Sequence, residues 1–285
     1  MPMKRATTRP APRAAPKEPS FAGIAGRIMP VAELKTPMRM ALYGRAGSGK
    51  TTLAASFPKP LLVDIKNEEG TASVTDVKGL KVISAEEWDD IEQIYWYLAD
   101  GKSGFQTVIL DTVTQMQELA IAHVMSKKKK GEDDEEAGAW GTMTKGDWGD
   151  VASLVKTWIM RFRDVGLSVV FIAQERVFNA GDEAGSEDGQ IQPEVGPRLS
   201  PSVRSALEAA VDYIGHTFVR EKVTRKRDEK TKKVTETRVM QYCLRLGPHA
   251  YYTTKVRKPK GIKVPSFLVD PSYEDLLELK TGIEG

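Results

Sequence analysis

Runs of consecutive apolar residues alternate along the chain with segments in which apolar residues recur every three or four positions. The runs predict buried strands at 38–43, 61–65, 105–110 and 167–173. The recurring pattern predicts amphipathic helices at 51–57, 88–98, 112–125 and 151–162. Strands that lack an alternating polar face, and that are separated by helices, are typical of a parallel sheet covered on both faces. The pattern therefore predicts an α/β core.

Beyond residue 200 the pattern changes to that of a hairpin. Residues 213–219 and 234–246 predict its two strands, which the highly charged segment 220–233 joins. A strand-like 266–269 and a short helix near 273–280 follow. We expect one core over 38–285 with this C-terminal β-hairpin as an extension.

Two long polar segments, 126–148 and 174–200, interrupt the core. The first holds a block of lysines followed by a block of acids, and the second carries several glycines. Loops of this length inside a compact domain are usually functional or disordered. We therefore expect both to be loops with a role in function.

The N-terminal residues 1–20 differ from the core in composition, with five prolines, five basic residues and one acid, Glu18. Such a segment has too little apolar surface to fold, which predicts a disordered basic tail. It is either a solvated leader or an electrostatic arm for nucleic acid. Residues 21–37 then form a linker to the core.

Composition excludes several classes of protein. With 40% hydrophobic and 28% charged residues the chain is an ordinary globular protein, and a net charge of +3 gives no bulk argument for nucleic acid. The single cysteine, Cys243, allows neither an intramolecular disulfide nor a cysteine zinc site. No apolar run suits a bilayer or a signal peptide, so we expect a soluble, cytoplasmic protein.

The segment 44–51 matches the phosphate-binding loop pattern G-x-x-x-x-G-K-[ST] completely, between an apolar strand and a helix. Its glycines let backbone N–H groups curl around phosphates, and the positive end of the helix dipole points at the same anion. Lys50 supplies a charge to the β- and γ-phosphates, and the Thr51 hydroxyl ligates Mg²⁺. The sequence predicts an ATP and Mg²⁺ site formed by Gly44, Arg45, Ala46, Gly47, Ser48, Gly49, Lys50, Thr51 and Thr52.

Carboxylates at two strand ends are candidates to complete this site. Asp111 ends the apolar stretch 107–110, where it either orients Mg²⁺ or caps the helix that follows. Asp64, Glu68 and Glu69 follow the second strand, where one of them either polarises the attacking water or belongs to a solvated acidic turn.

The order of these parts resembles the RecA-type recombinase core, and within it the phage-encoded single-strand annealing ATPases with an AAA-family nucleotide-binding domain. The resemblance spans roughly 38–270 and is strongest at 42–53, 108–113 and 169–176. It implies a RecA-like core, an oligomer with ATP at the protomer interface, and single-stranded DNA as partner. It also implies a phage origin and a single-strand-binding protein as a further partner.

The resemblance also implies roles for individual residues. Gln174 would sense the γ-phosphate and pass its state to the loop after it, although a Gln at this place can also simply cap a loop. Lys258 and Lys260 match lysines that reach a neighbour's ATP, unless they belong to an exposed basic turn. Phe21 and the residues up to 25 weakly resemble a peptide that related recombinases insert into the adjacent protomer.

By the same resemblance the loops 126–148 and 174–200 face DNA. Positive charge and aromatic rings are what single-strand binding uses. The candidate residues are Lys127, Lys128, Lys129, Lys130, Trp140, Lys145, Trp148, Arg176 and Arg198. The alternative for the first loop is a solvated segment whose lysines are neutralised by its own acids.

Two features depart from the family pattern. Lys66 stands where the family usually has a glutamate, and the glutamates come later, at 68 and 69. The segment after Gln174 holds six acids but only two arginines, which suits phosphate poorly. DNA contact would then rely on the tail, on 127–130, or on the hairpin with Lys222, Arg225, Arg227, Lys230, Lys232 and Lys233.

Three functions fit these residues. The first is an ATP-hydrolysing DNA-recombination protein that promotes annealing or strand pairing and is stimulated by DNA. The second is a ring-forming motor ATPase of the helicase type with the same core. The third is an annealing protein that binds ATP without appreciable turnover, which the Lys66 departure favours.

Overall fold

The computed structural model describes residues 22–30, 36–66, 70–129, 143–178, 193–227 and 234–282, in two units, Met1–Thr36 and Pro37–Gly285. In the first unit the described residues form one short helix, α1 (Ala22–Ala25), and the Arg27 Nε–H donates to the Gly23 carbonyl oxygen at 3.1 Å. The predicted basic tail and Phe21 lie outside the described residues.

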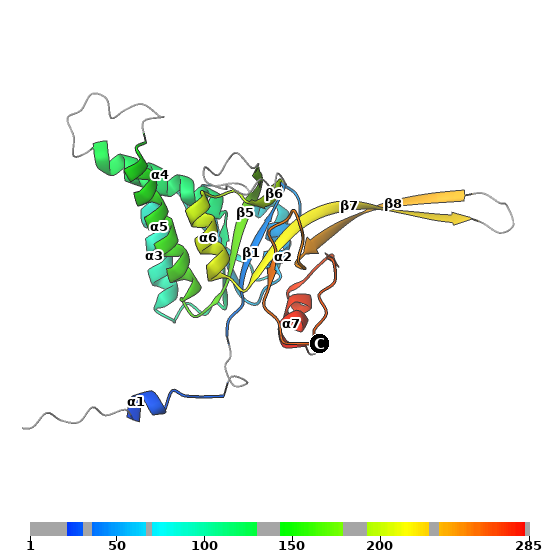
Figure 1. The fold of residues 1–285 in the computed structure, drawn as a ribbon, viewed down its shortest axis with the longest axis horizontal. Coiled ribbons are helices and arrows are strands. Elements are labelled where there is room, and N and C mark those ends of the chain that lie inside the picture. Colours follow the sequence, from blue (N-terminus) through cyan, green and yellow to red (C-terminus); the bar gives the residue numbers. More distant parts are fainter. Residues whose placement is uncertain are drawn as a thin grey trace, which may run out of the picture. The chain divides into compact units, whose positions relative to one another are not determined.

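The second unit is built on a ten-stranded sheet, whose order along its main path is β10-β8-β7-β1-β5-β4-β2-β3 (Figure 1). Its parallel strands are β1 (Arg39–Gly44), β2 (Pro60–Ile65), β3 (Lys81–Ala85), β4 (Thr107–Asp111), β5 (Ser168–Phe178) and β7 (Tyr213–Arg227). Because parallel neighbours end at one edge of a sheet, the residues that follow β1, β4 and β2 lie near one another.

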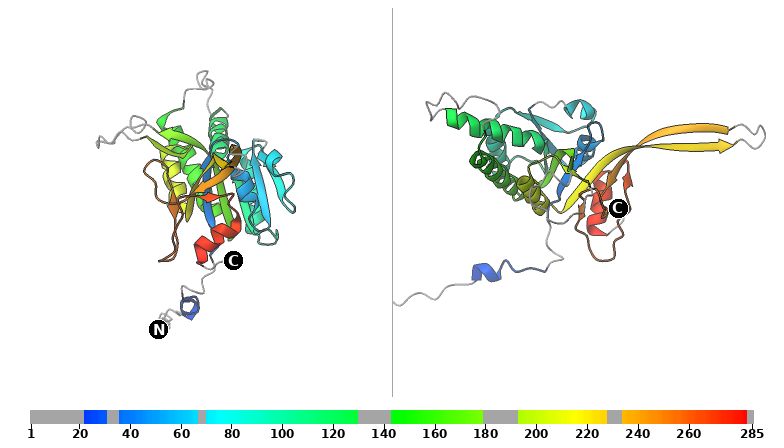
Figure 2. Two further views of the ribbon diagram at one scale, coloured as in Figure 1. Left: turned by 90° about the vertical axis from the view of Figure 1, so that its right-hand side faces the viewer. Right: turned by 45° about the horizontal axis from the view of Figure 1, so that its top comes forward.

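The remaining strands are antiparallel to their partners. They are β6 (Glu194–Pro197) on β5, β8 (Val234–Arg245) and β9 (Lys255–Val256) on β7, and β10 (Leu268–Val269) on β8. The β7–β8 pair continues for twelve residues in register and extends as a long hairpin beyond the rest of the second unit (Figures 1 and 2). The predicted hairpin is therefore present, but its first strand continues to Arg227, through residues predicted to join the two strands.

Helices cover both faces of the sheet. On one face lie α3 (Trp88–Ala99), α4 (Val113–Lys129), α5 (Lys145–Arg163) and α6 (Pro201–Ala210), and on the other α2 (Lys50–Ala55), the 3-10 helix η2 (Gly70–Val74) and α7 (Tyr273–Thr281) (Figure 1). Alternate residues of one strand serve the two cores, with Ala41 and Tyr43 in the first and Met40 and Leu42 in the second. The predicted α/β fold with a mostly parallel, doubly covered sheet is confirmed.

Several element boundaries differ from the prediction. The segment after Gln174 is not wholly a loop, because β5 runs on to Phe178 and β6 pairs back onto it. The helix α5 begins earlier, at Lys145, because Thr144 caps it with a side-chain oxygen that accepts from the Asp147 N–H.

Strand β3 and helix α6 were not predicted. Strand β3 lies at the edge of the sheet and exposes four of its five residues, so it lacks an apolar run. Helix α6 begins with a proline and is short. None of the helices in the described part of the chain is both long and apolar enough to span a membrane.

Candidate nucleotide-binding site

The loop between β1 and α2 closes tightly on itself. Gly49 precedes α2 in the left-handed conformation, with φ of 85°, which favours glycine. A Cβ on Gly44 would lie 2.4 Å from the Thr217 carbonyl oxygen, so only glycine allows β1 to approach β7 this closely. The sequence pattern thus reflects backbone geometry that few other residues permit.

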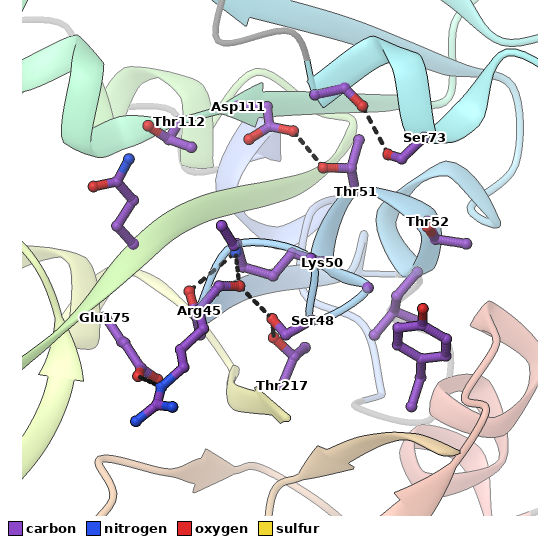
Figure 3. A pocket seen from close by; sticks show the side chains of 18 of the residues that line it. Arg45, Ser48, Lys50, Thr51, Thr52, Ser73, Asp111, Thr112, Glu175 and Thr217 are labelled. Atoms are coloured by element: carbon purple, nitrogen blue, oxygen red, sulfur yellow. Dashed lines mark hydrogen bonds and ion pairs between the residues drawn. The ribbon is translucent and has the colours of Figure 1, made fainter. Parts of the chain in front are cut away.

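Polar side chains inside the loop hold its shape. Lys50 is only 9% exposed, and its ammonium donates to the carbonyl oxygens of Gly44 at 3.0 Å and Arg45 at 2.8 Å (Figure 3). The Ser48 hydroxyl donates to the same Arg45 oxygen at 2.7 Å and lies 2.7 Å from the Thr217 hydroxyl. Lys50 is therefore positioned over the loop, where its N–H donors can turn to phosphate oxygens.

Two oxygen-bearing side chains meet beside the loop. The Thr51 hydroxyl donates to Asp111 Oδ2 at 2.7 Å, and Asp111 is 7% exposed at the end of β4 (Figure 3). A hydroxyl and a carboxylate are hard ligands that suit Mg²⁺, which takes its other ligands from phosphates and water. The described residues hold no cluster of three or more His, Cys, Asp or Glu arranged for a metal, so these two oxygens fit a site that the nucleotide completes.

Thr112, the residue after Asp111, caps the helix that follows, which is the alternative role predicted for Asp111. Thr112 Oγ1 accepts a hydrogen bond from the Gln115 N–H at 3.2 Å, at the start of α4. Thr112 therefore serves the first turn of that helix, while Asp111 faces Thr51 and the pocket. The sequence could not separate these roles because the two residues are adjacent.

Gln174 lies where β1 and β5 are in register, opposite Gly44. It lines the pocket, its backbone N–H donates to Thr114 Oγ1 at 3.2 Å, and its side-chain oxygen accepts from Arg198 at 3.1 Å. Because β5 continues for four residues beyond it, Gln174 is part of a strand and does not cap a loop. Strand β5 thus connects the pocket to Arg176 and to strand β6, which pairs with it beyond Gln174.

The pocket has a volume of about 1060 Å³ and brings together residues distant in sequence. The predicted loop residues 44–52 all line the pocket, and so do Asp111 and Gln174. Leu53, directly after the loop, also lines the pocket. Sequence reasoning missed the remaining lining residues, which have no motif: Gly70, Ala72, Ser73, Thr112, Glu175, Thr217, Tyr242, Cys243, Asp270 and Pro271.

A chain of polar contacts leads from exposed Arg45 in the loop, through Glu175 and buried His216, to the hairpin. Arg45 donates to Glu175 at 3.0 Å, and Glu175 lies 3.2 Å from His216 Nε2. Arg245, which can only donate, lies 3.0 Å from His216 Nδ1, so that nitrogen accepts and Nε2 carries the proton. Burial lowers the pKa of His216 to about 4, with Glu175 opposing this shift and Arg245 adding to it. The imidazole is therefore neutral near pH 7.

Other predicted residues do not reach the pocket. Lys258 and Lys260 follow β9 as exposed residues and do not line the pocket of their own chain. Asp64 is buried on β2, in register with Asp111, but also does not line it. Glu68 and Glu69 lie outside the described residues.

The predicted DNA-contacting residues fall into two places. Lys127 lies in the last turn of α4, and Lys145 and Trp148 lie in the first turn of α5, all exposed. Arg176 is exposed on β5, with its guanidinium 5.3 Å from the ring centre of Phe178, and Arg198 follows β6. Lys130 and Trp140, and the side chains of Lys128 and Lys129, lie outside the described residues.

The chain was compared with families and with curated proteins. No curated protein matches it. The family model described as an AAA domain matches residues 36–257, which include the phosphate-binding loop, Asp111, Gln174 and the β7–β8 hairpin. The geometry of Lys50, Thr51 and Asp111 agrees with this match. The chain belongs to the AAA domain family of P-loop ATPases.

Proposed function

We propose that the protein is an ATP-hydrolysing DNA-recombination protein that binds single-stranded DNA as an oligomer and promotes annealing or strand pairing. Nucleotide binding and hydrolysis are general properties of its family. The observation that carries the finer proposal is that Gln174 lines the nucleotide pocket on the strand that also carries exposed Arg176. A change at the γ-phosphate can therefore be passed along β5 to exposed Arg176.

The residues of the pocket divide the work by position. A bound Mg²⁺·ATP supplies the phosphoanhydride bond whose cleavage provides the energy. Lys50 and the N–H groups at the start of α2 bind and orient the phosphates. Thr51 and Asp111, which are hydrogen-bonded to each other, would hold the metal, and Gln174, which lines the pocket, would contact the γ-phosphate. Glu68 or Glu69 is proposed to orient the attacking water.

Two surfaces support the proposed contact with DNA. The first surface carries the exposed cations Lys127 and Lys145 and the ring of Trp148, a residue that is 45% exposed. The hairpin adds Arg220 and Lys222 on one face, whereas its Arg225 and Arg238 are paired with Glu236 and Glu221. Arg220 donates to Gln241 Oε1 at 2.8 and 3.0 Å and lies over the Phe267 ring, so exposed Lys222 is the hairpin cation best placed for phosphate.

The exposure of Lys258 and Lys260 outside their own pocket supports a role in a neighbouring protomer. Cations that complete a phosphate site from another chain make hydrolysis depend on assembly. The proposed partners are accordingly a second copy of the chain, single-stranded DNA and a single-strand-binding protein.

The test is steady-state ATP hydrolysis with and without single-stranded DNA, for the wild type, Lys50→Ala and the control Lys78→Ala, an exposed lysine outside the pocket. We expect strong stimulation by DNA in the wild type and the control, and its loss in Lys50→Ala. Hydrolysis that DNA does not change would contradict the recombination mechanism. Electron microscopy then separates the outcomes: filaments on DNA support recombination, and closed rings without DNA support a motor.

One observation favours an annealing protein without turnover as the second candidate. Lys66 stands at the family's glutamate position, is exposed directly after β2, and its N–H donates to Ala85. Tight ATP binding without measurable hydrolysis, with or without DNA, would select this candidate.

A further inference from the structure

The part of the pocket lined by β8 and by the turn after β10 has no role in the scheme above. Tyr242, Asp270 and Pro271 line it, and Tyr242 is 47% exposed. Tyr242 lies close to the phosphate loop, because a Cβ on Gly49 would meet its ring carbon Cδ1 at 3.2 Å. An aromatic ring thus borders the phosphate-binding loop on an open surface.

The direction of the phosphate chain follows from α2. Gly49 is the N-cap of α2 and Thr51 is the second residue of the helix. A Cβ on Gly49 would point at Tyr242, whereas the Thr51 hydroxyl contacts Asp111, so the two positions face different parts of the pocket lining. Thr51 contacts Asp111, which marks the metal and the γ-phosphate end (Figure 3). The α-phosphate and the nucleoside must then leave the loop toward the Gly49 side, where Tyr242 lies.

The backbone fixes Tyr242 and Asp270 together. The Tyr242 N–H donates to Asp270 Oδ1 at 3.2 Å, and the Asp270 N–H donates to the Tyr242 carbonyl oxygen at 2.6 Å. Asp270 also has a left-handed backbone, with φ of 48°, directly after the paired strand β10. A carboxylate has about four acceptor positions, so one bond to Tyr242 leaves capacity for a ligand.

We propose that Tyr242 and Asp270 form the base-binding end of the pocket, where the Tyr242 ring stacks on the purine and the Asp270 carboxylate accepts from its 6-amino group. This inference rests on the proposed nucleotide-binding function. Stacking accepts any base, whereas a carboxylate acceptor favours adenine, which has an amino group at position 6, over hypoxanthine, which has a carbonyl oxygen there. Specificity for ATP would then come from Asp270.

The first experiment measures the dissociation constants of Mg²⁺·ATP and of Mg²⁺·tripolyphosphate, which has no base, by calorimetry. The variants are Tyr242→Ala, Tyr242→Phe and the control Tyr97→Ala, an exposed tyrosine on α3 outside the pocket. We expect Tyr242→Ala to weaken ATP binding about ten-fold and to leave tripolyphosphate unchanged. Tyr242→Phe and Tyr97→Ala should bind both probes like the wild type.

The second experiment compares ATP with inosine triphosphate in the wild type and in Asp270→Asn. The wild type should prefer ATP by about ten-fold or more, and Asp270→Asn should lose most of this preference because an amide can face either group at position 6.

The outcomes separate the two proposals. ATP affinity unchanged in Tyr242→Ala, or an equal loss for ATP and tripolyphosphate, would overturn the base-binding role while leaving nucleotide binding intact. The role of Asp270 would be overturned if the wild type and Asp270→Asn preferred ATP over inosine triphosphate to the same degree. A wild type that binds neither ATP nor tripolyphosphate would overturn the proposed function as well.

Discussion

The phosphate end of the pocket comes mainly from the continuous segment 44–51, which Asp111 joins from the end of β4. The opposite end comes from β8 and the turn after β10, some 200 residues after the loop. At the first end, Ser48, Lys50 and Asp111 are buried and hydrogen-bonded. At the second, Tyr242 and Asp270 are exposed. Binding an anion on backbone N–H groups demands a fixed local conformation, whereas packing a base demands only a suitable surface. We therefore expect substitutions at the first end to have the larger effects.

The largest effect is expected for Lys50→Ala. This change removes the charge that binds the phosphates, so ATP turnover should fall by at least about a hundred-fold. The Tyr242→Ala variant should lose far less ATP turnover than Lys50→Ala, because it alters the opposite end of the pocket. Comparable losses in steady-state hydrolysis by the two variants would break the comparison.

A smaller effect, on stability as well as binding, is expected for Gly44→Ala. The added Cβ would overlap the Thr217 backbone, and such overpacking costs about 1–3 kcal/mol. The control is Gly149→Ala in α5, where a Cβ meets no atom within 4 Å, and it should stabilise the protein by about 0.5–1 kcal/mol. Urea unfolding measures both changes. Equal stability of the two variants would contradict the close approach of β1 and β7.

His216, in the polar chain from Arg45 to Arg245, should make the free energy of unfolding depend on pH. His216 has a pKa of about 4 in the folded protein, against 6.5 when unfolded, so the unfolded state binds more protons between these values. The free energy of unfolding should therefore fall as pH drops from about 6.5 toward 4, by no more than about 3 kcal/mol from this group.

The measurement compares urea unfolding of the wild type and His216→Gln at pH 5 and pH 7. The loss on acidification should be smaller in the variant, because it has no imidazole to protonate. The same loss in both proteins would show that burial and the neighbouring Arg245 do not hold His216 neutral.

The smallest effect is expected for Arg45→Ala. The Arg45 side chain is 87% exposed, so its ion pair with Glu175 should contribute less than about 1 kcal/mol to the free energy of unfolding. A larger loss in the free energy of unfolding, measured with urea, would mean that Arg45 supports the contact between Glu175 and His216. Glu175 on β5 would then belong to the phosphate end of the pocket as well.

The α/β fold and the phosphate end could be predicted from the sequence for the same reason. Buried parallel strands such as β1, β4 and the first part of β5 are continuous apolar runs, and the loop 44–51 needs glycine and lysine at fixed spacings. Asp111 could be found because it ends an apolar run. Its neighbour Thr112, which caps α4, could not be told from it by pattern alone.

The rest of the site had no local signal. Thr217, Tyr242 and Asp270 reach the pocket because of strand register and the pairing of β10 with β8, which the sequence does not encode locally. The continuation of β5 past Gln174 was missed because its residues 174–177 are polar or exposed. Edge strand β3 was missed for the same reason.

The central claim is that Thr51 and Asp111 hold the magnesium that accompanies ATP. The most direct test is the affinity for ATP, with and without Mg²⁺, of the wild type, Asp111→Asn and the control Asp76→Asn, an exposed carboxylate outside the pocket. We expect Mg²⁺ to tighten ATP binding in the wild type and the control. In Asp111→Asn about ten- to a hundred-fold more Mg²⁺ should be needed for the same gain. An identical Mg²⁺ dependence in all three proteins would contradict the account.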